Sequence, residues 1–341
     1  MTEQHRQNGP RVVCAGDGFI SAALLARALE HELPGVRTEL TDSGWPTEPF
    51  TGVDGVREAS GDPRVLAELV RGADALVTHL GPVTADVIEA GDGTLRAIGV
   101  TRGGPVNVDT AAAERAGIPV LNLPGRNLGA VAEYCVGSMI TALRGLPSAA
   151  ARLSAGSWDA EGFRYERTGP ELRACTVGLV GMGAVGRRVA EILGAFRSTV
   201  LAHDPYADPD EARRAGVRLV SLPELLAESD VVSLHARLTD QTRHVIGAEA
   251  LATMRSGALL VNTARGELVD HRALERALES GHLRGAVLDV FDPEPPAPGD
   301  TLTARPEVWA TPHLAGASTQ VAEESAGRIA REVVRVLRSR S

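Results

Sequence analysis

Short apolar runs alternate with helical patterns along the first part of the chain. The runs are bounded by turn residues and predict buried strands, while apolar residues at helical spacing lie between them. We expect strands at Val12–Ala15, Ala75–Thr78, Leu95–Val100 and Ile118–Asn122, and helices at Ile20–Glu30 and Thr110–Ala116. Strands that alternate with helices predict a parallel sheet covered on both faces.

The same alternation restarts after a long helical stretch of small and apolar residues, Leu128–Arg144. Six more strands follow, with helical patterns between them. They are expected at Thr176–Val180, Thr199–His203, Val231–His235, Ala258–Asn262, Ala286–Val290 and Val308–Thr311. Six strands with intervening helices predict a second, doubly wound sheet.

The last helical pattern, Ser318–Arg338, repeats apolar residues at helical spacing. The second sheet is complete without this helix. We therefore expect the helix to return to the N-terminal segment and to complete the first domain. The chain is predicted to be an α/β protein with two doubly wound parallel-sheet domains.

Composition and charge narrow the classes of function. The 341 residues are 43% hydrophobic and 23% charged, which suits about two globular domains. A net charge of −9 disfavours nucleic acid or an anionic membrane as partner. No apolar run approaches the roughly 18 residues that a bilayer span needs, and the polar segment Thr2–Pro10 lacks the core of a signal peptide. The three cysteines form no CxxC pair, so we expect a cytoplasmic protein without a metal site.

A glycine fingerprint follows the first strand of the second sheet. Gly181 permits a tight turn, Gly183 permits a pyrophosphate to approach the backbone, and Gly186 permits close packing of helix on strand. The amides of Ala184 and Val185 then lie at a helix N-terminus, where they can bind phosphate. An ordinary glycine turn is the alternative.

The acidic residue at the end of the next strand favours the dinucleotide interpretation. Asp204 can accept hydrogen bonds from the adenosine ribose hydroxyls, and its charge would repel a 2′-phosphate. The sequence therefore predicts NAD rather than NADP. A second glycine turn, Gly16-Asp17-Gly18, has Ser21 where a third glycine would stand, so it is interpreted as a plain turn.

Three chemically active residues follow predicted strands of the second sheet. Arg265 can bind a carboxylate with two hydrogen bonds and donate to a keto oxygen. His313 is a candidate general acid–base, and Glu294 can hold its imidazole. Asp289, near its strand's end, can accept from the nicotinamide amide. The alternatives are a surface arginine, a solvated carboxylate and a structural histidine.

These motifs resemble those of the D-isomer-specific 2-hydroxyacid dehydrogenases, the family of phosphoglycerate dehydrogenase. The resemblance runs from about residue 75 to the C-terminus. It rests on the glycine fingerprint, a Ser-Leu-His strand and three segments, listed here: Asn262–Asp270, Leu288–Pro295 and Thr311–Gly316. It implies that Arg265 binds the substrate carboxylate and carbonyl, that His313 transfers the proton and that Glu294 orients His313. It also implies NAD contacts around the following residues: Ala184, Val185, Asp204, Thr263, Ala264, Asp289 and Gly316.

The resemblance also implies an architecture. A Rossmann NAD-binding domain, residues 124–316, is expected to be inserted into a flavodoxin-like substrate domain, residues 1–123 completed by 317–341. A homodimer is expected. Because the sequence ends at Ser341, we expect no C-terminal regulatory domain of the kind that some phosphoglycerate dehydrogenases carry.

The substrate loop departs from the family's usual pattern. Gly103 and Gly104 can offer backbone amides to a carboxylate, but Arg102 stands where many relatives have a small residue. Arg102 either binds a second anionic group of the substrate, such as a phosphate, or points to solvent. His79, after the second expected strand, is a further candidate for lining the substrate cleft.

The predicted function is NAD-dependent hydride transfer between a small D-2-hydroxy acid and its 2-keto acid, with the D configuration implied by the resemblance. Two alternatives stay open. One is an NAD(H)-sensing protein like the family's corepressors, which keep the same three residues. The other is a phosphite-type dehydrogenase on the same scaffold.

Overall fold

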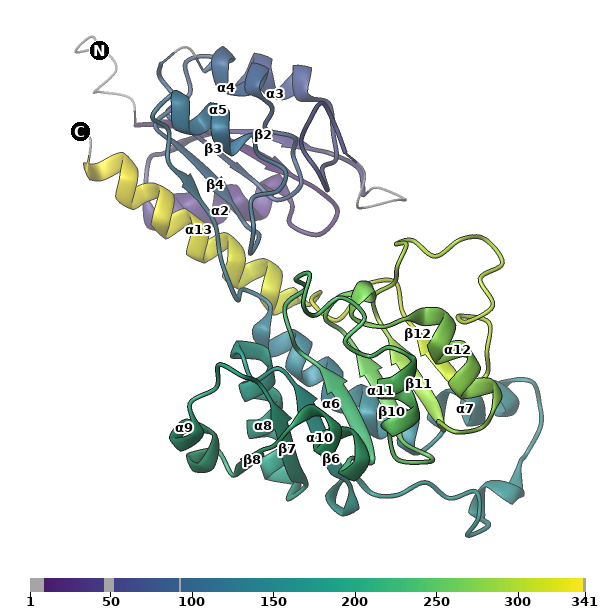
Figure 1. Cartoon of the computed structure of the whole chain (residues 1–341). Coiled ribbons are helices and arrows are strands. Elements are labelled where there is room, and N and C mark those ends of the chain that lie inside the picture. Colours follow the sequence, from purple (N-terminus) through teal and green to yellow (C-terminus); the bar gives the residue numbers. More distant parts are fainter. Residues whose placement is uncertain (1–8, 46–51, 92, 340–341) are drawn as a thin grey trace. The chain divides into compact units, whose positions relative to one another are not determined.

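The computed structural model describes residues 9–45, 52–91 and 93–339 (Figure 1). Most of Thr2–Pro10 lies outside the described residues. The chain divides into two compact units. Unit 1 contains Met1–Arg126 and Ala317–Ser341, and unit 2 contains Asn127–Gly316. The last helix therefore belongs to the same unit as the N-terminal sheet.

Unit 1 is built on a five-stranded parallel sheet with the order β2-β1-β3-β4-β5. The strands are β1 (Arg11–Gly16), β2 (Arg37–Asp42), β3 (Ala75–Thr78), β4 (Ala97–Val100) and β5 (Val120–Leu121). This is the flavodoxin-like order. Strand β2 was not predicted, because its side chains are only half-buried or exposed along an edge of the sheet.

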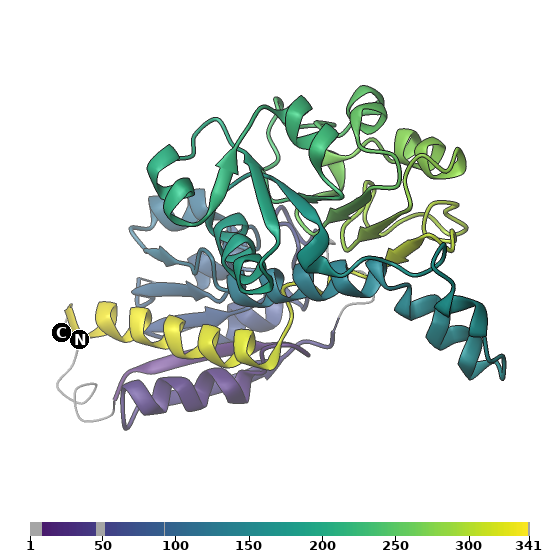
Figure 2. The same ribbon diagram turned by 90° about the horizontal axis from the view of Figure 1, so that it is seen from below.

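Helices cover both faces of this sheet. On one face, α2 (Ala22–Glu32) and α13 (Thr319–Ser339) share a core with the strands and lie side by side (Figure 2). The opposite core contains α3 (Pro63–Leu69), α4 (Ala85–Ala90) and α5 (Thr110–Arg115). Helix α13 approaches β4 closely, because a Cβ on Gly99 would lie 2.8 Å from Val333 and 2.9 Å from Ile329. Helix α13 and the strands of unit 1 therefore share one hydrophobic core.

Unit 2 contains a seven-stranded parallel sheet with the order β12-β11-β10-β9-β6-β7-β8. Its strands are β6 (Thr176–Val180), β7 (Thr199–His203), β8 (Val217–Leu219), β9 (Val231–Leu234), β10 (Leu259–Asn262), β11 (Gly285–Leu288) and β12 (Val308–Ala310). Six strands were predicted. The prediction missed β8, a three-residue edge strand in which only Val217 is buried. The prediction of two doubly wound α/β sheets is confirmed.

Two hydrophobic cores cover the faces of this second sheet. One contains α6 (Leu128–Leu143) and α8 (Ala184–Phe196), and the other contains α10 (Leu222–Glu228), α11 (Ala248–Thr253) and α12 (His271–Glu279). The remaining short elements are α7 (Leu146–Ser154), α9 (Pro209–Arg214), η1 (Ala160–Phe163), η2 (Leu172–Ala174) and η3 (Gly266–Leu268). Among the described residues, no helix combines the length and apolar character of a bilayer-spanning segment.

Candidate active site

Three neighbouring strands of unit 2 end at the same edge of the sheet. Asn262 of β10 pairs with Leu288 of β11, and Leu288 pairs with Ala310 of β12. Arg265 follows the first of these strands and His313 follows the third. All three strands are parallel, so the two residues leave the sheet at its carboxyl edge, where doubly wound sheets bind their ligands.

Glu294 and His313 are in direct contact. Nδ1 of His313 lies 2.6 Å from Oε1 of Glu294, whose Oε2 accepts a hydrogen bond from the Phe291 amide at 3.1 Å. A carboxylate can only accept, so Nδ1 carries the hydrogen and proton exchange by this ring would use Nε2. The sequence prediction that a carboxylate holds this imidazole corresponds to this geometry.

Asp289 fastens the loop that carries His313. Its buried carboxylate accepts hydrogen bonds from the Thr311 hydroxyl (2.6 Å), the Leu314 amide (2.7 Å) and the Ala315 amide (2.8 Å), and its carbonyl accepts from the His313 amide (2.9 Å). These bonds hold His313 at φ 54°, a left-handed conformation that is uncommon outside glycine. The primary observed role of Asp289 is therefore to position the loop.

Tyr134 is a contributor that the sequence analysis missed. Its hydroxyl forms a short hydrogen bond with the hydroxyl of Thr311, which itself donates to the Asp289 carboxylate. The Thr311 hydroxyl has a single hydrogen, and Asp289 accepts it. The Tyr134 hydroxyl is therefore the donor in its bond with Thr311. Burial raises the pKa of the Tyr134 phenol and keeps this donor protonated. Nothing in the small and apolar pattern of α6 singles Tyr134 out, apart from its being an aromatic residue in a glycine- and alanine-rich helix.

Arg265 is exposed and stands on a well-defined loop. Asn262 donates to the Arg265 carbonyl at 2.8 Å and accepts from the Ala264 amide at 3.0 Å. The next residue, Gly266, touches the loop after β11, because a Cβ there would lie 2.0 Å from the Phe291 carbonyl carbon. The loops that carry Arg265 and Glu294 therefore pack against each other.

The glycine turn after β6 fits a dinucleotide. Gly181 has φ 100°, and a Cβ on it would lie 2.7 Å from the Ala236 nitrogen. A Cβ on Gly186 would lie 2.3 Å from the Gly181 carbonyl oxygen, so the helix and the turn are in close contact. Gly183, in contrast, has nothing within 4 Å of its Cβ position, and it caps α8 just before the amides of Ala184 and Val185. Open space beside a helix N-terminus is what a bound phosphate needs.

Asp204 follows β7 and also shapes the turn. One of its carboxylate oxygens accepts from the Met182 amide at 2.8 Å, and the other accepts from the Tyr206 amide at 2.9 Å. Each oxygen has a second lone pair, so both can still accept from ribose hydroxyls.

The other predicted cofactor residues lie in unit 2 as well. The Thr263 hydroxyl lies 2.9 Å from Sγ of Cys135, a thiol whose pKa burial raises to about 11. A Cβ on Gly316 would lie 2.3 Å from the Asn127 side-chain nitrogen, so the backbone passes close to the start of α6. Thr263 is thus fixed by a buried contact, and Gly316 by a close approach.

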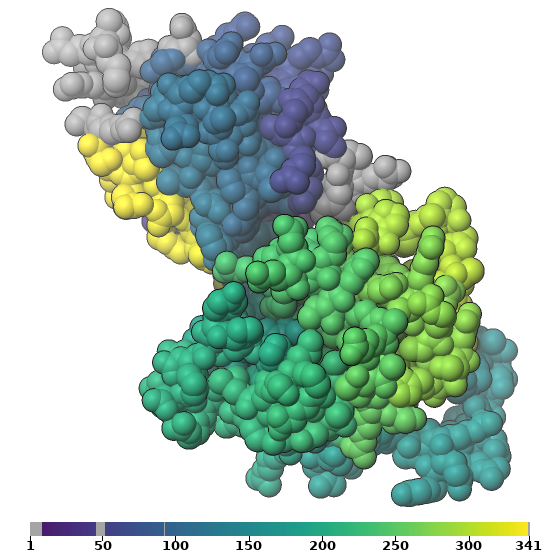
Figure 3. Space-filling view, viewed as in Figure 1, coloured from purple at the N-terminus to yellow at the C-terminus, as the bar shows by residue number. Residues whose placement is uncertain are grey.

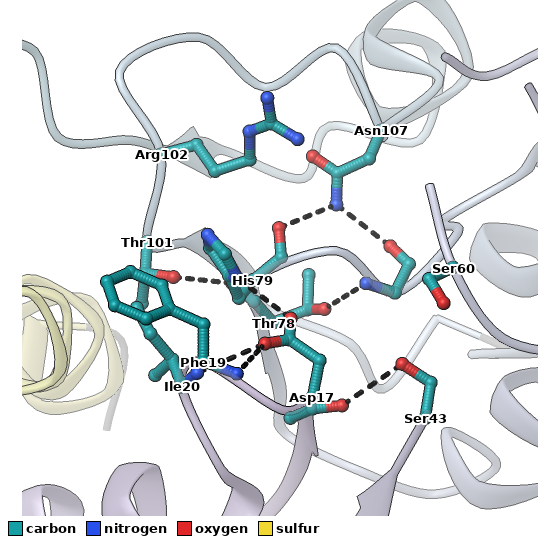
Figure 4. Close-up of polar contacts among 12 residues, drawn as sticks. Asp17, Phe19, Ile20, Ser43, Ser60, Thr78, His79, Thr101, Arg102 and Asn107 are labelled. Atoms are coloured by element: carbon teal, nitrogen blue, oxygen red, sulfur yellow. Dashed lines mark hydrogen bonds and ion pairs between the residues drawn. The ribbon is translucent and has the colours of Figure 1, made fainter. Parts of the chain in front are cut away.

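Apart from Arg265, the predicted substrate residues lie in unit 1. Figure 4 labels two of them, His79 and Arg102. Arg102 is ion-paired with Glu58 and donates to the Glu58 carbonyl at 3.0 Å, so it neither points freely to solvent nor offers an unpaired charge. Gly103 accepts from the Asn122 amide group at 2.7 Å, while Gly104 has open space around its Cβ position.

His79 is buried beside Asp17, with Nδ1 lying 2.7 Å from the Asp17 carboxylate (Figure 4). Asp17 also accepts from the amides of Phe19 and Ile20, so the segment is a turn as predicted, but its carboxylate has a further partner. Burial lowers the pKa of His79 and outweighs the opposing effect of Asp17. Burial acts to raise the pKa of Asp17, yet its hydrogen bonds and the charge of His79 hold that pKa below the usual 3.8.

Comparisons with known proteins agree with this geometry. Residues 136–315 match the sequence model of the D-isomer specific 2-hydroxyacid dehydrogenase family, NAD binding domain. The chain is 42% identical over 276 residues to D-3-phosphoglycerate dehydrogenase of Methanocaldococcus jannaschii, covering 80% of this chain and 51% of that protein. It is 37% identical over 278 residues to glyoxylate reductase of Korarchaeum cryptofilum, covering 81% and 83%. The structure of D-lactate dehydrogenase from Escherichia coli has a TM-score of 0.76 at 26% identity and covers 96% of this chain and 97% of that chain. The chain spans about half the length of the phosphoglycerate dehydrogenases that it matches.

Proposed function

We propose that this chain, which belongs to the D-isomer specific 2-hydroxyacid dehydrogenase family, interconverts a small D-2-hydroxy acid and its 2-keto acid with NAD(H). The observation that carries the proposal is the Glu294–His313 pair, which lies at the carboxyl edge of the sheet that also carries the glycine turn. An oriented acid–base group at the same sheet edge as a dinucleotide turn is suited to coupled hydride and proton transfer.

Arg265 binds the substrate. Its guanidinium offers two parallel hydrogen bonds to the carboxylate and a donor to the keto oxygen, which polarises the carbonyl. Arg265 is exposed, and its Nη1 donates to the neighbouring Ala264 carbonyl at 2.6 Å, so no carboxylate has to be displaced before a charged ligand binds. Arg265 therefore contributes both binding and stabilisation of the negative charge that develops on the oxygen.

His313 moves the proton. NADH held at the glycine turn would supply the hydride for C2 of the keto acid. Nε2 of protonated His313 donates its proton to the oxygen of that carbonyl, and in the oxidation the same nitrogen accepts it back. Glu294 stays ionised, fixes the tautomer and stabilises the cationic ring. The hydrogen bonds of Asp289 hold the His313 loop in place during both directions.

NAD is the cofactor, in agreement with the family's NAD-binding domain. The amides at the start of α8 bind the pyrophosphate, with Gly183 leaving space for it. Asp204 binds the ribose hydroxyls and disfavours NADP through charge repulsion with the 2′-phosphate. The free and buried cysteines support a reducing compartment, so we place the enzyme in the cytoplasm.

A second copy of the chain is the proposed partner. Five large hydrophobic residues between positions 146 and 165 are at least half exposed, from Leu146 at 50% to Tyr165 at 92%. This segment projects from unit 2 in Figure 2 and lies at the lower right of Figure 3. Apolar patches of this kind on a globular domain mark association sites.

Light scattering should give the mass of a dimer for the native chain and the mass of a monomer for the double variant Trp158→Ser/Phe163→Ser. Tyr206→Ser, at an equally exposed aromatic residue elsewhere in unit 2, should stay dimeric.

A steady-state assay tests the proposed reaction. NADH oxidation is followed with a panel of 2-keto acids, with the His313→Asn variant as the control for proton transfer. Turnover that falls at least about 100-fold in the variant supports the proposal. Tight NADH binding without turnover of any keto acid would instead support the sensor alternative, and NAD reduction by phosphite alone would support the phosphite alternative.

A further inference from the structure

The carboxyl ends of β1 and β3 in unit 1 carry a second charged group of residues. These strands are neighbours, and the chain leaves β1 toward β2 on one side and β3 toward β4 on the other. Such a topological switch point is where open α/β sheets bind ligands. Asp17 follows β1, His79 follows β3, and Arg126 joins them from the segment after β5.

The three residues form a directed chain of hydrogen bonds. Ionised Asp17 can only accept, so the neutral His79 ring carries its hydrogen on Nδ1. Its Nε2 is therefore an acceptor, and Nη2 of Arg126 lies 3.4 Å from it. The Arg126 guanidinium also lies over the Phe19 ring, 5.9 Å from its centroid. The guanidinium is held from two sides by groups that carry no net charge.

Arg126 consequently lacks a counter-ion. Among the described residues no carboxylate forms an ion pair with it, and its Nη1 is buried without a hydrogen-bond partner. Burial, aided by the charge of Arg102, lowers the pKa of Arg126 to about 10, so it stays protonated at neutral pH. Leaving a charged donor buried and unsatisfied is costly, and such groups in native proteins call for an explanation. An anionic ligand atom would satisfy Nη1.

The other arginine of this region is already neutralised. Arg102 forms its ion pair and a further hydrogen bond with Glu58, and its side chain is only 16% exposed. An anion would have to displace Glu58 to reach Arg102, whereas nothing has to leave Arg126.

Arg126 also lies next to the glycine loop to which the family resemblance assigns substrate binding. Leu123 links the two, because its amide donates to the Arg102 carbonyl at 2.7 Å and its carbonyl accepts from the Arg126 amide at 3.2 Å. Asn122 donates to the Gly103 carbonyl at 2.7 Å. The segment that carries Arg126 and the glycine loop are therefore one hydrogen-bonded layer.

We propose that Arg126 is the specificity residue that binds a second anionic group of the substrate, a phosphate or a second carboxylate. His79 and Asp17 are its positioning residues. This inference rests on the proposed function, since it concerns the substrate of the same reaction. It assigns to Arg126 the role that the sequence suggested for Arg102.

The test uses pairs of keto acids that differ in one anionic group. NADH-dependent reduction of 3-phosphohydroxypyruvate is compared with that of hydroxypyruvate, and oxaloacetate with pyruvate. Arg126→Gln should raise KM for the preferred substrate with two anionic groups about 30-fold or more, while kcat/KM for the partner that lacks the second group changes less than threefold. The pair that responds tells whether the group is a phosphate or a carboxylate. Arg115→Gln, the same change at an exposed residue of unit 1, should alter neither pair.

Two further measurements keep the inference falsifiable. Arg126→Lys retains the charge and should recover part of the discrimination, and the melting temperature of Arg126→Gln should not fall, because the variant removes a buried unpaired donor. Equal losses for substrates with and without the second anionic group, or no loss for either, would overturn the inference while leaving the dehydrogenase intact. If no keto acid is reduced at all, the proposed function fails. Calorimetric titration then compares two pairs of ligands that differ in one anionic group, D-3-phosphoglycerate with D-glycerate and D-malate with D-lactate. Tighter binding of the first ligand of a pair, lost in Arg126→Gln, would support the role of Arg126. Equal binding within both pairs overturns the inference.

Discussion

Gly183 and Gly181 lie two residues apart in the same turn, yet alanine should have opposite effects at the two positions. Gly183 has φ −69° and ψ −162°, which any residue can adopt, and its Cβ position has nothing within 4 Å. Gly181 has φ 100°, and its Cβ position lies 2.7 Å and 2.8 Å from backbone atoms of Ala236 and His235.

The magnitudes follow from these surroundings. Gly183→Ala places no strain on the protein alone and should leave its unfolding free energy unchanged or raise it by about 0.5 kcal/mol through the unfolded chain. A methyl group against the pyrophosphate is an overpacked contact that costs about 1–3 kcal/mol, so NADH affinity should fall about 5- to 150-fold. Gly181→Ala combines backbone strain with overlap against a fixed backbone and should cost about 3 kcal/mol or more.

Two measurements separate these effects. Thermal melting without cofactor should show Gly181→Ala roughly 6–12 °C below the native chain and Gly183→Ala level with it. Titration followed by NADH fluorescence should show the affinity loss in Gly183→Ala. Gly194→Ala, at an equally open position later in α8, is the matched control and should change neither cofactor binding nor the fold. Native NADH affinity in Gly183→Ala would refute the placement of the pyrophosphate at this turn.

Three further predictions follow from the hydrogen bonds of the two units. Glu294→Gln keeps a polar group beside His313 but removes the negative charge and the fixed tautomer of the ring. The kcat should therefore fall about 100-fold or more, while NADH affinity stays unchanged. A loss of kcat under threefold in stopped-flow turnover would contradict the role of Glu294. Asp289→Asn sets a side-chain N–H against the backbone amides that now donate to Asp289, such as that of Ala315. Denaturant titration should show that the free energy of unfolding falls by about 3 kcal/mol, and kcat should fall strongly as well. A free energy of unfolding within about 1 kcal/mol of that of the native chain would contradict the role given to Asp289. Burial holds the folded pKa of His79 below its usual 6.5, so the unfolded chain takes up a proton that the folded chain does not as pH falls through that value. Between pH 7 and 5.5 the native chain should therefore lose more stability than His79→Gln, and equal losses in urea titrations would contradict the lowered pKa of His79.

The sequence predicted the central strands because a strand buried on both faces is apolar throughout. The two strands it missed, β2 and β8, lie at sheet edges and bury few side chains, so no apolar run marks them. The same reasoning predicted Arg265, Glu294 and His313, since each follows a strand whose carboxyl end the parallel topology fixes. The distance between these three residues along the sequence did not affect the prediction, because parallel strands end at the same edge of the sheet.

Contacts that depend on side-chain burial could not be predicted in this way. Asp17 and His79 are 62 positions apart and meet only because β1 and β3 pair in a register that sets Ala15 beside Thr78. The glycines around Asp17 indicated a turn, which is present, but gave no sign of a buried partner. Arg102 was the conspicuous cation of the substrate loop, yet its charge is neutralised by Glu58, more than 40 residues earlier in the chain. Whether a charged residue can bind a ligand depends on the residues around it in the fold, and the local sequence pattern does not show which residues those are.

The catalytic carboxylates of unit 2 and the polar groups around Arg126 in unit 1 differ in whether the protein already supplies their hydrogen-bond partners, and this difference bears on what each group does. In unit 2 the carboxylates of Asp289 and Glu294 already accept hydrogen bonds from the protein, which makes a rigid site that needs little rearrangement during proton transfer. In unit 1 a buried donor of Arg126 and the buried Oδ1 of Asn107 have no partner among the described residues. Rigid, satisfied groups suit chemistry that every substrate of the family shares. Unsatisfied groups are stabilised only by a ligand that supplies the missing atoms, so they discriminate between substrates by what each one carries.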